Sequence, residues 1–438
     1  MDALAKLPVY DEYKSTRVKW LEEVPCHWDE YPICSKAKLK SITNTVGEDL
    51  LSVYLDKGVI RFDEVEQKRT NVTSLDLSKY QLVEVGDFVL NNQQAWRGSV
   101  GVSSYRGIVS PAYLVLSLAE GLMPKFANYL FRDGGMVSHY LISSKGVGTI
   151  QRNLYWPQLK RAPLFIPPVE EQLSIANFLD TKTAQIDEAI SIKEKQIALL
   201  KERKQIIIQK AVTQGLNTDV QMKDSGVEWI GQIPEHWEIK KLRYLGFTQN
   251  GISAGAEYFG EGYPFVSYGD VYKNRQLPIA VDGLAKSSIG DQKLYSVLSG
   301  DIFFTRTSET IEEIGFASIC FADIQKATFA GFLIRFRPSS SLLSKEFSKY
   351  YFNSSMMRQY FVKEMNLVIR ASLSQELLKN LPVVLPPEKE QMEIFGYLEH
   401  ASRQIDDTIS LQKNQIEKLK EYKATLINSA VTGKIKVA

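Results

Sequence analysis

The chain has 438 residues, of which 44% are hydrophobic and 24% charged, and its formal net charge is +2. This length predicts two to four domains rather than one core, with an ordinary globular composition. It contains no run of eighteen apolar residues, no signal-peptide stretch and only three cysteines without CxxC spacing, so we expect a cytoplasmic protein without membrane spans or a disulfide framework. A near-neutral total charge neither supports nor excludes DNA as a partner.

Residues 1–165 are predicted to form a mixed α/β domain. Short alternating or apolar runs predict strands at 81–90 and 108–118, and residues 126–131 predict a helix. The domain opens with the motif WLEEVPCHW, which ends in His27-Trp28. Because His27 lacks a neighbouring cluster of Cys, Asp or Glu, we expect it to cap or to pack beside Trp28 rather than to bind a metal.

Two polar clusters of this region are candidates for DNA contacts. One follows the Gly86-Asp87 strand and the other precedes the first long helix. Amides and Arg make bidentate contacts to adenine and guanine edges, whereas Lys usually contacts phosphate. Ordinary solvated loop residues are the alternative interpretation. The candidates are Asn92, Gln93, Gln94, Arg97, Arg106, Lys145, Gln151, Arg152 and Asn153.

A long helix is predicted within residues 166–215. Residues 171–213 contain neither Pro nor Gly and are rich in Ile, Leu, Lys, Glu and Gln. Pro167-Pro168 and acidic residues mark its start, and Gly215 is a plausible stop. At 1.5 Å per residue such a helix is about 65 Å long, so its apolar stripe requires a partner.

Residues 216–384 are predicted to form a second mixed α/β domain. It opens with WIGQIPEHW, and strands are expected at 301–305 and 327–336 and a helix at 345–359. The motif GD recurs at Gly300-Asp301, and a polar group follows it as one follows Gly86-Asp87. The DNA-contact candidates here are Tyr268, Lys273, Arg275, Thr305, Arg306, Ser308 and Arg370. Because the two domains differ, we expect an asymmetric target.

Residues 385–438 contain a second long helix that repeats the first. Residues 167–213 and 386–432 align without a gap and are identical at 21 of 47 positions, so the chain is a pseudo-two-fold repeat. We expect the two helices to pack as an antiparallel coiled coil; two separate amphipathic helices, each buried against its own domain, are the alternative. Isoleucines recur every eleven residues, which is about 3.67 residues per turn over three turns and close to the 3.6 of an α-helix. The predicted seam comprises Ile175, Ile186, Ile197, Ile208, Ile394, Ile405, Ile416 and Ile427.

Catalytic signatures are lacking. The sequence has no GxxxxGK[ST] or HExxH motif and no Cys/His metal spacing. The IPPV and LPPE segments lack the preceding Asn or Asp and the following aromatic residue of the amino-methyltransferase motif. We therefore expect a protein that is not an enzyme by itself and that binds no cofactor or metal.

Two differing α/β domains, each followed by a PPxxEQ-led long helix that ends in AVT and a nearby glycine, resemble the specificity subunit of Type I restriction–modification systems. The resemblance spans essentially the whole chain and rests on Pro167-Pro168 with Glu171-Gln172, on Pro386-Pro387 with Glu390-Gln391, and on both AVT endings. It implies two target recognition domains, each reading half of a split sequence in double-stranded DNA. It also implies helices that space the domains and dock two methylation subunits, with restriction subunits joining the assembled complex. S-adenosylmethionine, ATP and Mg²⁺ then belong to the partner subunits.

Two other functions are compatible with parts of this pattern. A protein-only scaffold would use the helix pair to clamp two partners, and a stand-alone nuclease would need an unrecognised site. DNA shift assays distinguish the first alternative, and metal-dependent cleavage by the purified chain distinguishes the second.

Overall fold

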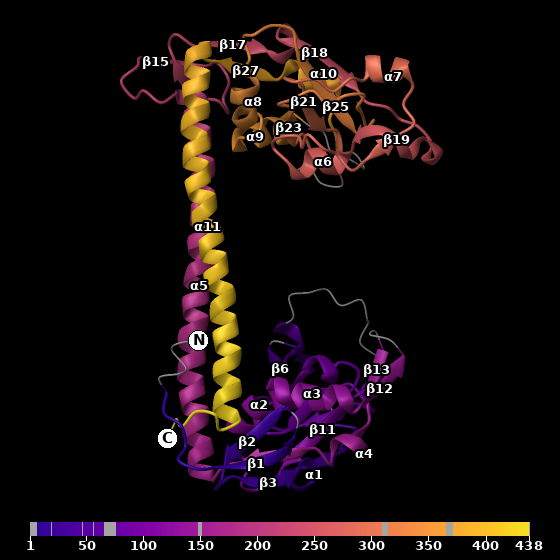
Figure 1. The fold of residues 1–438 in the computed structure, drawn as a ribbon, viewed down its shortest axis with the longest axis vertical. Helices are drawn as coiled ribbons and strands as arrows, with labels where there is room; N and C mark the ends of the chain where they lie inside the picture. Colours follow the sequence, from indigo (N-terminus) through magenta and orange to yellow (C-terminus); the bar gives the residue numbers. More distant parts are fainter. Residues whose placement is uncertain are drawn as a thin grey trace. The chain divides into compact units, whose positions relative to one another are not determined.

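The computed structural model describes residues 7–18, 20–45, 47–55, 57–64, 76–147, 151–308, 314–364 and 371–437. The chain divides into two compact units (Figure 1). Unit 1 comprises Met1–Lys193 with Lys413–Ala438, and unit 2 comprises Glu194–Gln412. Each unit therefore contains one α/β domain and a part of each long helix.

The two long helices are α5 (Val169–Gln214) and α11 (Glu388–Val431). Each has acidic residues in its first turn, where negative charge complements the helix dipole. Gly215 (φ 75°) and Gly433 (φ 74°) follow their last turns in the left-handed conformation, which favours glycine. The predicted stop at Gly215 is therefore confirmed, and Gly433 follows the end of α11 in the same conformation. Gly396 lies inside α11, and the helix continues through it.

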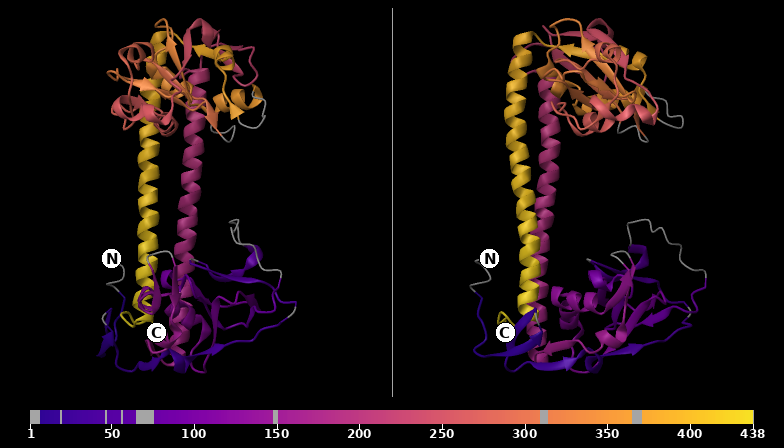
Figure 2. Two further views of the ribbon diagram at one scale, coloured as in Figure 1. Left: turned by 90° about the vertical axis from the view of Figure 1, so that its right-hand side faces the viewer. Right: turned by 45° about the vertical axis from the view of Figure 1, so that its right-hand side comes forward.

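The helices α5 and α11 run antiparallel. In unit 1, Lys423 Nζ lies 2.6 Å from Asp187 Oδ2. In unit 2, Lys204 Nζ lies 2.6 Å from Asp406 Oδ2. The α11 partner falls in number as the α5 partner rises, as antiparallel pairing requires. Within each unit, the parts of α5 and α11 lie side by side (Figure 2).

The predicted seam is only partly correct. The four isoleucines of α5 are buried: Ile175, Ile186, Ile197 and Ile208. On α11, Ile394 and Ile416 are buried, whereas Ile405 and Ile427 are half-buried. Eleven residues turn an ideal helix by about 20° beyond three full turns, so a row with this spacing does not keep to one line. Neighbours on the same face are the more deeply buried residues there, namely Leu398, Ile409 and Leu426.

The α/β domain of unit 1 is built on an antiparallel sheet of four strands in the order β4-β11-β8-β9. The strands span Ala37–Lys40, Tyr113–Leu118, Phe88–Asn91 and Val100–Val102. Phe88 of β8 stacks on Phe131 of helix α2 with ring centroids 4.1 Å apart. The same core takes in apolar residues from α5 and from the end of α11.

The remaining elements of this domain surround the sheet. The helices are α1 (Ile33–Lys36), α2 (Pro124–Arg132), α3 (Gly134–Ile142) and α4 (Trp156–Leu159), with 3-10 turns η1 (Phe62–Glu64) and η2 (Ala95–Arg97). The other strands are β1 (Tyr13–Val18), β2 (Leu21–Pro25), β3 (Asp29–Pro32), β5 (Leu51–Tyr54), β6 (Gly58–Arg61), β7 (Gln81–Val83), β10 (Gly107–Val109), β12 (Ser144–Val147), β13 (Gln151–Leu154) and β14 (Pro163–Ile166).

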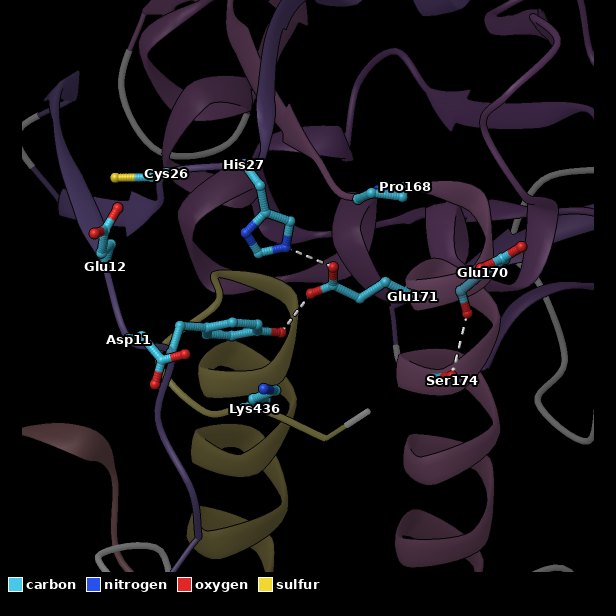
Figure 3. A pocket seen from close by; sticks show the side chains of 10 residues that line it. Asp11, Glu12, Cys26, His27, Pro168, Glu170, Glu171, Ser174 and Lys436 are labelled. Carbon is cyan, nitrogen blue, oxygen red and sulfur yellow. Dashed lines mark hydrogen bonds and ion pairs between the residues drawn. The ribbon is translucent and has the colours of Figure 1, made fainter.

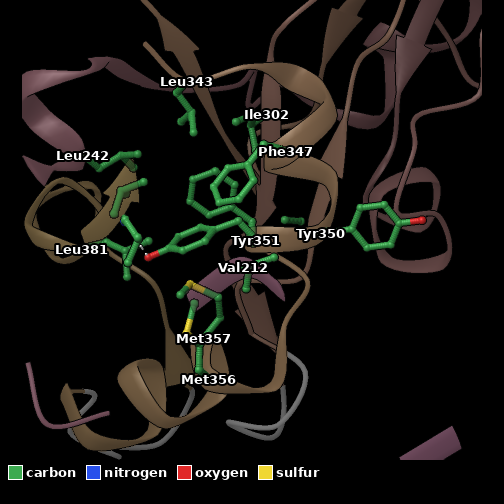
Figure 4. Packing of buried hydrophobic residues seen from close by; sticks show 14 of the residues in the cluster. Val212, Leu242, Ile302, Leu343, Phe347, Tyr350, Tyr351, Met356, Met357 and Leu381 are labelled. Atoms are coloured by element: carbon green, nitrogen blue, oxygen red, sulfur yellow. Dashed lines mark hydrogen bonds between the residues drawn. The ribbon is translucent and has the colours of Figure 1, made fainter. Parts of the chain in front are cut away.

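Unit 2 repeats this design with the sheet order β18-β25-β21-β23. The strands span Gly246–Asn250, Leu333–Pro338, Ile302–Thr305 and Ala317–Ile319. Figure 4 shows the core, in which Tyr351 lies among Leu242, Phe347 and Met357 while Val212 enters from α5. The buried Tyr351 hydroxyl donates to the Pro382 carbonyl at 3.0 Å, so its polar group is satisfied.

The other elements of unit 2 complete its domain. The helices are α6 (Tyr268–Lys273), α7 (Ile289–Leu294), α8 (Lys345–Tyr351), α9 (Ser355–Glu364) and α10 (Gln375–Asn380), with 3-10 turns η3 (Leu242–Tyr244) and η4 (Ala256–Tyr258). The strands are β15 (Met222–Asp224), β16 (Gln232–Pro234), β17 (Glu238–Lys241), β19 (Phe259–Val266), β20 (Leu284–Ala285), β22 (Thr307–Ser308), β24 (Thr328–Phe329), β26 (Ala371–Ser372) and β27 (Pro382–Leu385).

Turns divide several elements that the sequence predicts as continuous. The 81–90 segment is two strands, β7 and β8, because Gly86 takes a φ of 91° between them. The 345–359 segment is two helices, α8 and α9. Apolar runs persist across both interruptions, so periodicity alone did not reveal them. Among the described residues no helix is long and apolar enough to span a membrane, and no group of three or more His, Cys, Asp or Glu is placed to hold a metal ion.

Candidate nucleic-acid interface

In unit 1 the fold brings together the two polar clusters of the first domain. The backbone N–H of Leu154, at the end of β13, donates to the carbonyl of Asn92, directly after β8, at 3.1 Å. The guanidinium carbon of Arg152 lies 5.6 Å from the centroid of the Trp96 ring in η2. Segments more than fifty residues apart in the sequence thus form one surface, composed of η2 and the β12–β13 hairpin.

Short-range hydrogen bonds hold the η2 side of this surface in place. Asn91 Oδ1 accepts from the N–H of Gln93 at 3.1 Å, an Asx turn that ends β8. Gly98 then takes a φ of 96°, and a Cβ there would lie 3.3 Å from Val137 Cγ2 of α3. Behind the turn, the buried Ser99 hydroxyl donates to the Val53 carbonyl at 2.8 Å. Side chains on the outer side of η2 therefore project from a fixed backbone.

Most of the predicted residues of this surface are accessible. The exposed ones are Gln93, Arg97, Lys145 and Asn153, and the half-buried ones are Asn92, Gln94 and Arg152. The buried Oδ1 of Asn92 has no hydrogen-bond partner among the described residues. Gln151 pairs with Val147 in the hairpin, and its side chain lies outside the described part of the chain.

Arg106 lies apart from this surface. It follows β9 near the start of β8, whereas Asn92 follows the end of that strand. Its Nε lies 2.9 Å from Glu48 Oε1 and its Nη1 lies 3.2 Å from Glu84 Oε1. These carboxylates raise the pKa of the Arg106 guanidinium. The grouping of Arg106 with the η2 residues was therefore wrong, because the intervening β9–β10 turn carries it to the other end of the sheet.

Unit 2 builds the corresponding surface in the same way. The N–H of Leu373 donates to the Arg306 carbonyl at 2.7 Å, as Leu154 does to Asn92 in unit 1. Thr307 and Ser308 in β22 pair with Ser372 and Ala371 in β26. Arg306 is half-buried. The side chain of Ser308 and all of Arg370 lie outside the described residues.

Thr305 is a correction to the predicted site. It is fully buried, and its hydroxyl accepts the N–H of Phe316 at 2.9 Å. Thr305 therefore supports the turn beneath the surface rather than forming part of it. The reason is its position in the last residue of β21, whose side chain points into the core.

Helix α6 adds the third predicted group. Ser267 and Asp270 form a capping box that starts the helix. Tyr268 stacks on Tyr272 with ring centroids 5.8 Å apart, while Lys273 is exposed and Arg275 half-buried. Tyr272 in turn meets the Phe316 ring at 5.2 Å, next to Thr305, so this group adjoins the Arg306 surface. Lys273 and Arg275 also line a cavity of about 350 Å³.

The Gly-Asp pairs that precede both surfaces have a structural role. Glu84 donates its N–H to Asp87 Oδ2, and Leu298 donates to Asp301 Oδ2, both at 2.8 Å. Gly86 and Gly300 take φ values of 91° and 93° in these turns. The two strands that lead to the candidate surfaces, β8 and β21, therefore each begin after a turn of the same kind.

A carboxylate joins the opening motif of each domain to the start of a long helix. In unit 1, Glu171 accepts a hydrogen bond from Trp28 Nε1 at 3.0 Å. Its carboxylate also lies 2.7 Å from His27 Nε2 (Figure 3). Burial and a hydrogen bond to the same carboxylate raise the pKa of Tyr10. A cavity of about 730 Å³ opens beside this joint. The counterparts in unit 2, at 2.9 and 2.7 Å, are Glu390, Trp237 and His236.

The glutamine of each PPxxEQ motif binds the backbone of its own domain. Gln172 is fully buried; it accepts from the N–H of Met123 and donates to the carbonyls of Gly121 and Pro167, at 2.8 to 2.9 Å. Gln391 makes the equivalent bonds to Ser344, Leu342 and Pro386. Sequence reasoning missed this role, although the retention of glutamine in both copies was a usable signal. The recurrent motifs thus fix the domains to the helices and leave the differing residues on the candidate surfaces.

The comparisons with known proteins agree with this organisation. Residues 234–421 match the family described as Type I restriction modification DNA specificity domain. The chain is 25% identical to the Type I restriction enzyme MjaVIII specificity subunit of Methanocaldococcus jannaschii, over 88% of this chain and 86% of the relative. It is also 25% identical to the Type I restriction enzyme EcoKI specificity subunit of Escherichia coli, over 81% and 79% respectively.

Two solved structures share the fold. One, described as showing complex assembly and conformational transition of the type I R-M system, contains a chain with a TM-score of 0.70 and 15% identity, covering 94% of this chain and 99% of that one. The HsdS subunit from Thermoanaerobacter tengcongensis has a TM-score of 0.54 and 16% identity, covering 94% and 98%.

Proposed function

We propose that this chain is a Type I restriction–modification specificity subunit, in which each domain reads one half of an asymmetric, bipartite DNA target. The observation that supports this is the pair of surfaces built on equivalent backbones. In both, the segment after the Gly-Asp strand is hydrogen-bonded to the segment that precedes the next helix. The side chains that project from them differ, so two different half-sites are expected.

The chemistry of the surfaces suits a DNA duplex. Amide and guanidinium groups of Gln93, Arg97 and Arg152 can bond adenine and guanine edges, and Lys145 can contact phosphate. Recognition elements that read a split site must also hold a defined separation, because equivalent groove positions recur about every 34 Å. We assign that role to the antiparallel pair of α5 and α11.

The internal repeat also bears on assembly. Two copies of the helix and of the joint at Glu171 and Glu390 create two quasi-equivalent surfaces, which would dock two methylation subunits on one chain. Restriction subunits would join through that complex. In this proposal the chain itself is non-catalytic, and the partner subunits carry S-adenosylmethionine, ATP and Mg²⁺.

Methylation mapping tests the recognition proposal. Genomic DNA from cells with and without this gene is compared, and the gene should add adenine methylation at a motif with two different halves separated by a fixed spacer. A motif with identical inverted halves, or no added methylation when the methylation partner is present, would contradict it. Mass measurement of the purified complex tests the assembly; a stable one-to-one complex at excess partner contradicts two docking surfaces.

A further inference from the structure

Trp96 lies between two arginines that come from different parts of the chain. The guanidinium carbon of Arg97 is 4.6 Å from the Trp96 ring centroid, and that of Arg152 is 5.6 Å away. Within about 6 Å the negative face of an indole attracts a cation. The ring therefore holds a residue of η2 and a residue of the β12–β13 hairpin in one cluster.

Contacts within its own turn hold the indole ring of Trp96 in place. Its Nε1 donates to the carbonyl of Gln93 at 3.0 Å, and the preceding Ala95 is fully buried. Gly98 closes the turn with a hydrogen bond to the Ala95 carbonyl at 2.8 Å. Because its backbone and ring nitrogen are both held, the Trp96 side chain can act as a platform.

Two cations on one ring indicate an anionic or acceptor-rich ligand. Like charges beside the same ring repel each other, and the Arg97 side chain is exposed. A guanidinium that lies against an aromatic ring still has its N–H edge available for two parallel hydrogen bonds. Such edges match the O6 and N7 acceptors of guanine or a pair of phosphate oxygens.

We propose that Trp96 is a positioning residue, which holds Arg97 and Arg152 in one cluster and directs the guanidinium edge of Arg97 at acceptor atoms of DNA in the half-site of the first domain. This inference rests on the proposed function. It applies to one half-site alone, because the matching sequence after β21, RTSETIEEIGF, has three glutamates and no tryptophan. Glutamate accepts hydrogen bonds from cytosine rather than donating to guanine.

The test compares wild type, Trp96→Ala, Trp96→Leu and Trp96→Phe in the full chain with its methylation partner. Each complex selects from a duplex DNA pool with a randomised central segment, and the bound molecules are sequenced. Phe keeps an aromatic face, whereas Leu keeps apolar bulk without one. Ala and Leu should weaken selection at the first half-site by about tenfold, and Phe should remain within about threefold of wild type. Selection at the second half-site should be unchanged.

The salt dependence of binding separates the two sources of acceptors. If Trp96→Ala loses a preference for guanine while the slope of log affinity against log salt concentration stays unchanged, the acceptors are base edges. If that slope becomes smaller by about one per lost contact, the acceptors are phosphates. Either outcome supports the proposal. If Leu and Phe behave alike, or if Ala leaves both half-sites and the slope unchanged, Trp96 does not position the arginines. A wild-type complex that selects no sequence would instead refute the proposed function.

Discussion

Replacing Gln172 with leucine should loosen unit 1 and leave unit 2 intact. Gln172 has no exposed surface, and its amide is the only partner described for the backbone N–H of Met123 and for the carbonyls of Gly121 and Pro167. Leucine has a similar volume but offers neither donor nor acceptor. The substitution therefore removes three hydrogen bonds without creating a large cavity.

The magnitude follows from the groups left without partners. A buried backbone group that loses its hydrogen bond costs about 1–3 kcal/mol, so three groups cost at least roughly 3 kcal/mol if each is at the lower end. For a unit of about 150–250 residues, each kcal/mol lowers the melting temperature by roughly 2–4 °C. The expected decrease in the melting temperature of unit 1 is therefore about 6–12 °C.

Peptide-resolved hydrogen exchange is the appropriate assay, because two units need not unfold in one transition. Residues 119–123 and the first turns of α5 should exchange faster in Gln172→Leu, and peptides of unit 2 should not change. Gln391→Leu should produce the mirror-image result. Gln185→Leu, on an exposed position of α5 within unit 1, is the matched control and should change stability by less than about 0.5 kcal/mol. The reasoning is refuted if Gln172→Leu melts within 2 °C of wild type or accelerates exchange equally in both units.

Three further predictions concern the helices, the second surface and pH. Ile197→Asp buries a charge on α5 and should lower the affinity for the full split target while half-site binding survives. Leu199→Asp, at a position 63% exposed, should have little effect. DNA shift assays compare the affinities of the two variants. Arg306→Ala should change the bases selected at the second half-site alone, which methylation mapping detects. Burial lowers the pKa of His139, whose Nε2 accepts the Trp20 Nε1–H at 3.3 Å and must therefore be neutral. The unfolded chain then binds the proton more readily, so the stability of unit 1 should fall as the pH drops through about 6.5, and His139→Gln should flatten this dependence in denaturant titrations at pH 5.5 and 7.5.

The internal repeat made the large-scale organisation predictable from sequence. The helix bounds followed from proline, acidic and glycine signals at both ends, because these act through local backbone chemistry. The exact seam did not follow, since burial on α11 depends on the face presented to α5. Ile405 and Ile427 illustrate this, as both lie on the predicted row and are only half-buried.

The candidate surfaces were predictable in composition but not in detail. Polar clusters after the Gly-Asp strands marked where to look, and chain topology then brought each to a second segment. Burial of Thr305 and the carboxylate partners of Arg106 depend on three-dimensional neighbours that no local pattern encodes. The sequence did not single out Trp96, because an aromatic residue among polar ones is typical of packing. The role proposed for Trp96 depends instead on the two arginines beside its ring.

The composition of unit 1 has a consequence for biosynthesis. Its core joins residues before Lys193 to Leu426, Ala430 and Val431, which follow the whole of Glu194–Gln412. At about 5–20 residues per second, the ribosome needs roughly 10–40 s to make that intervening segment. During this interval the apolar face near Ile175 and Leu179 lacks its final partner, whereas unit 2 is continuous in sequence and can close first. The part of the chain that is made first is therefore the last to finish folding.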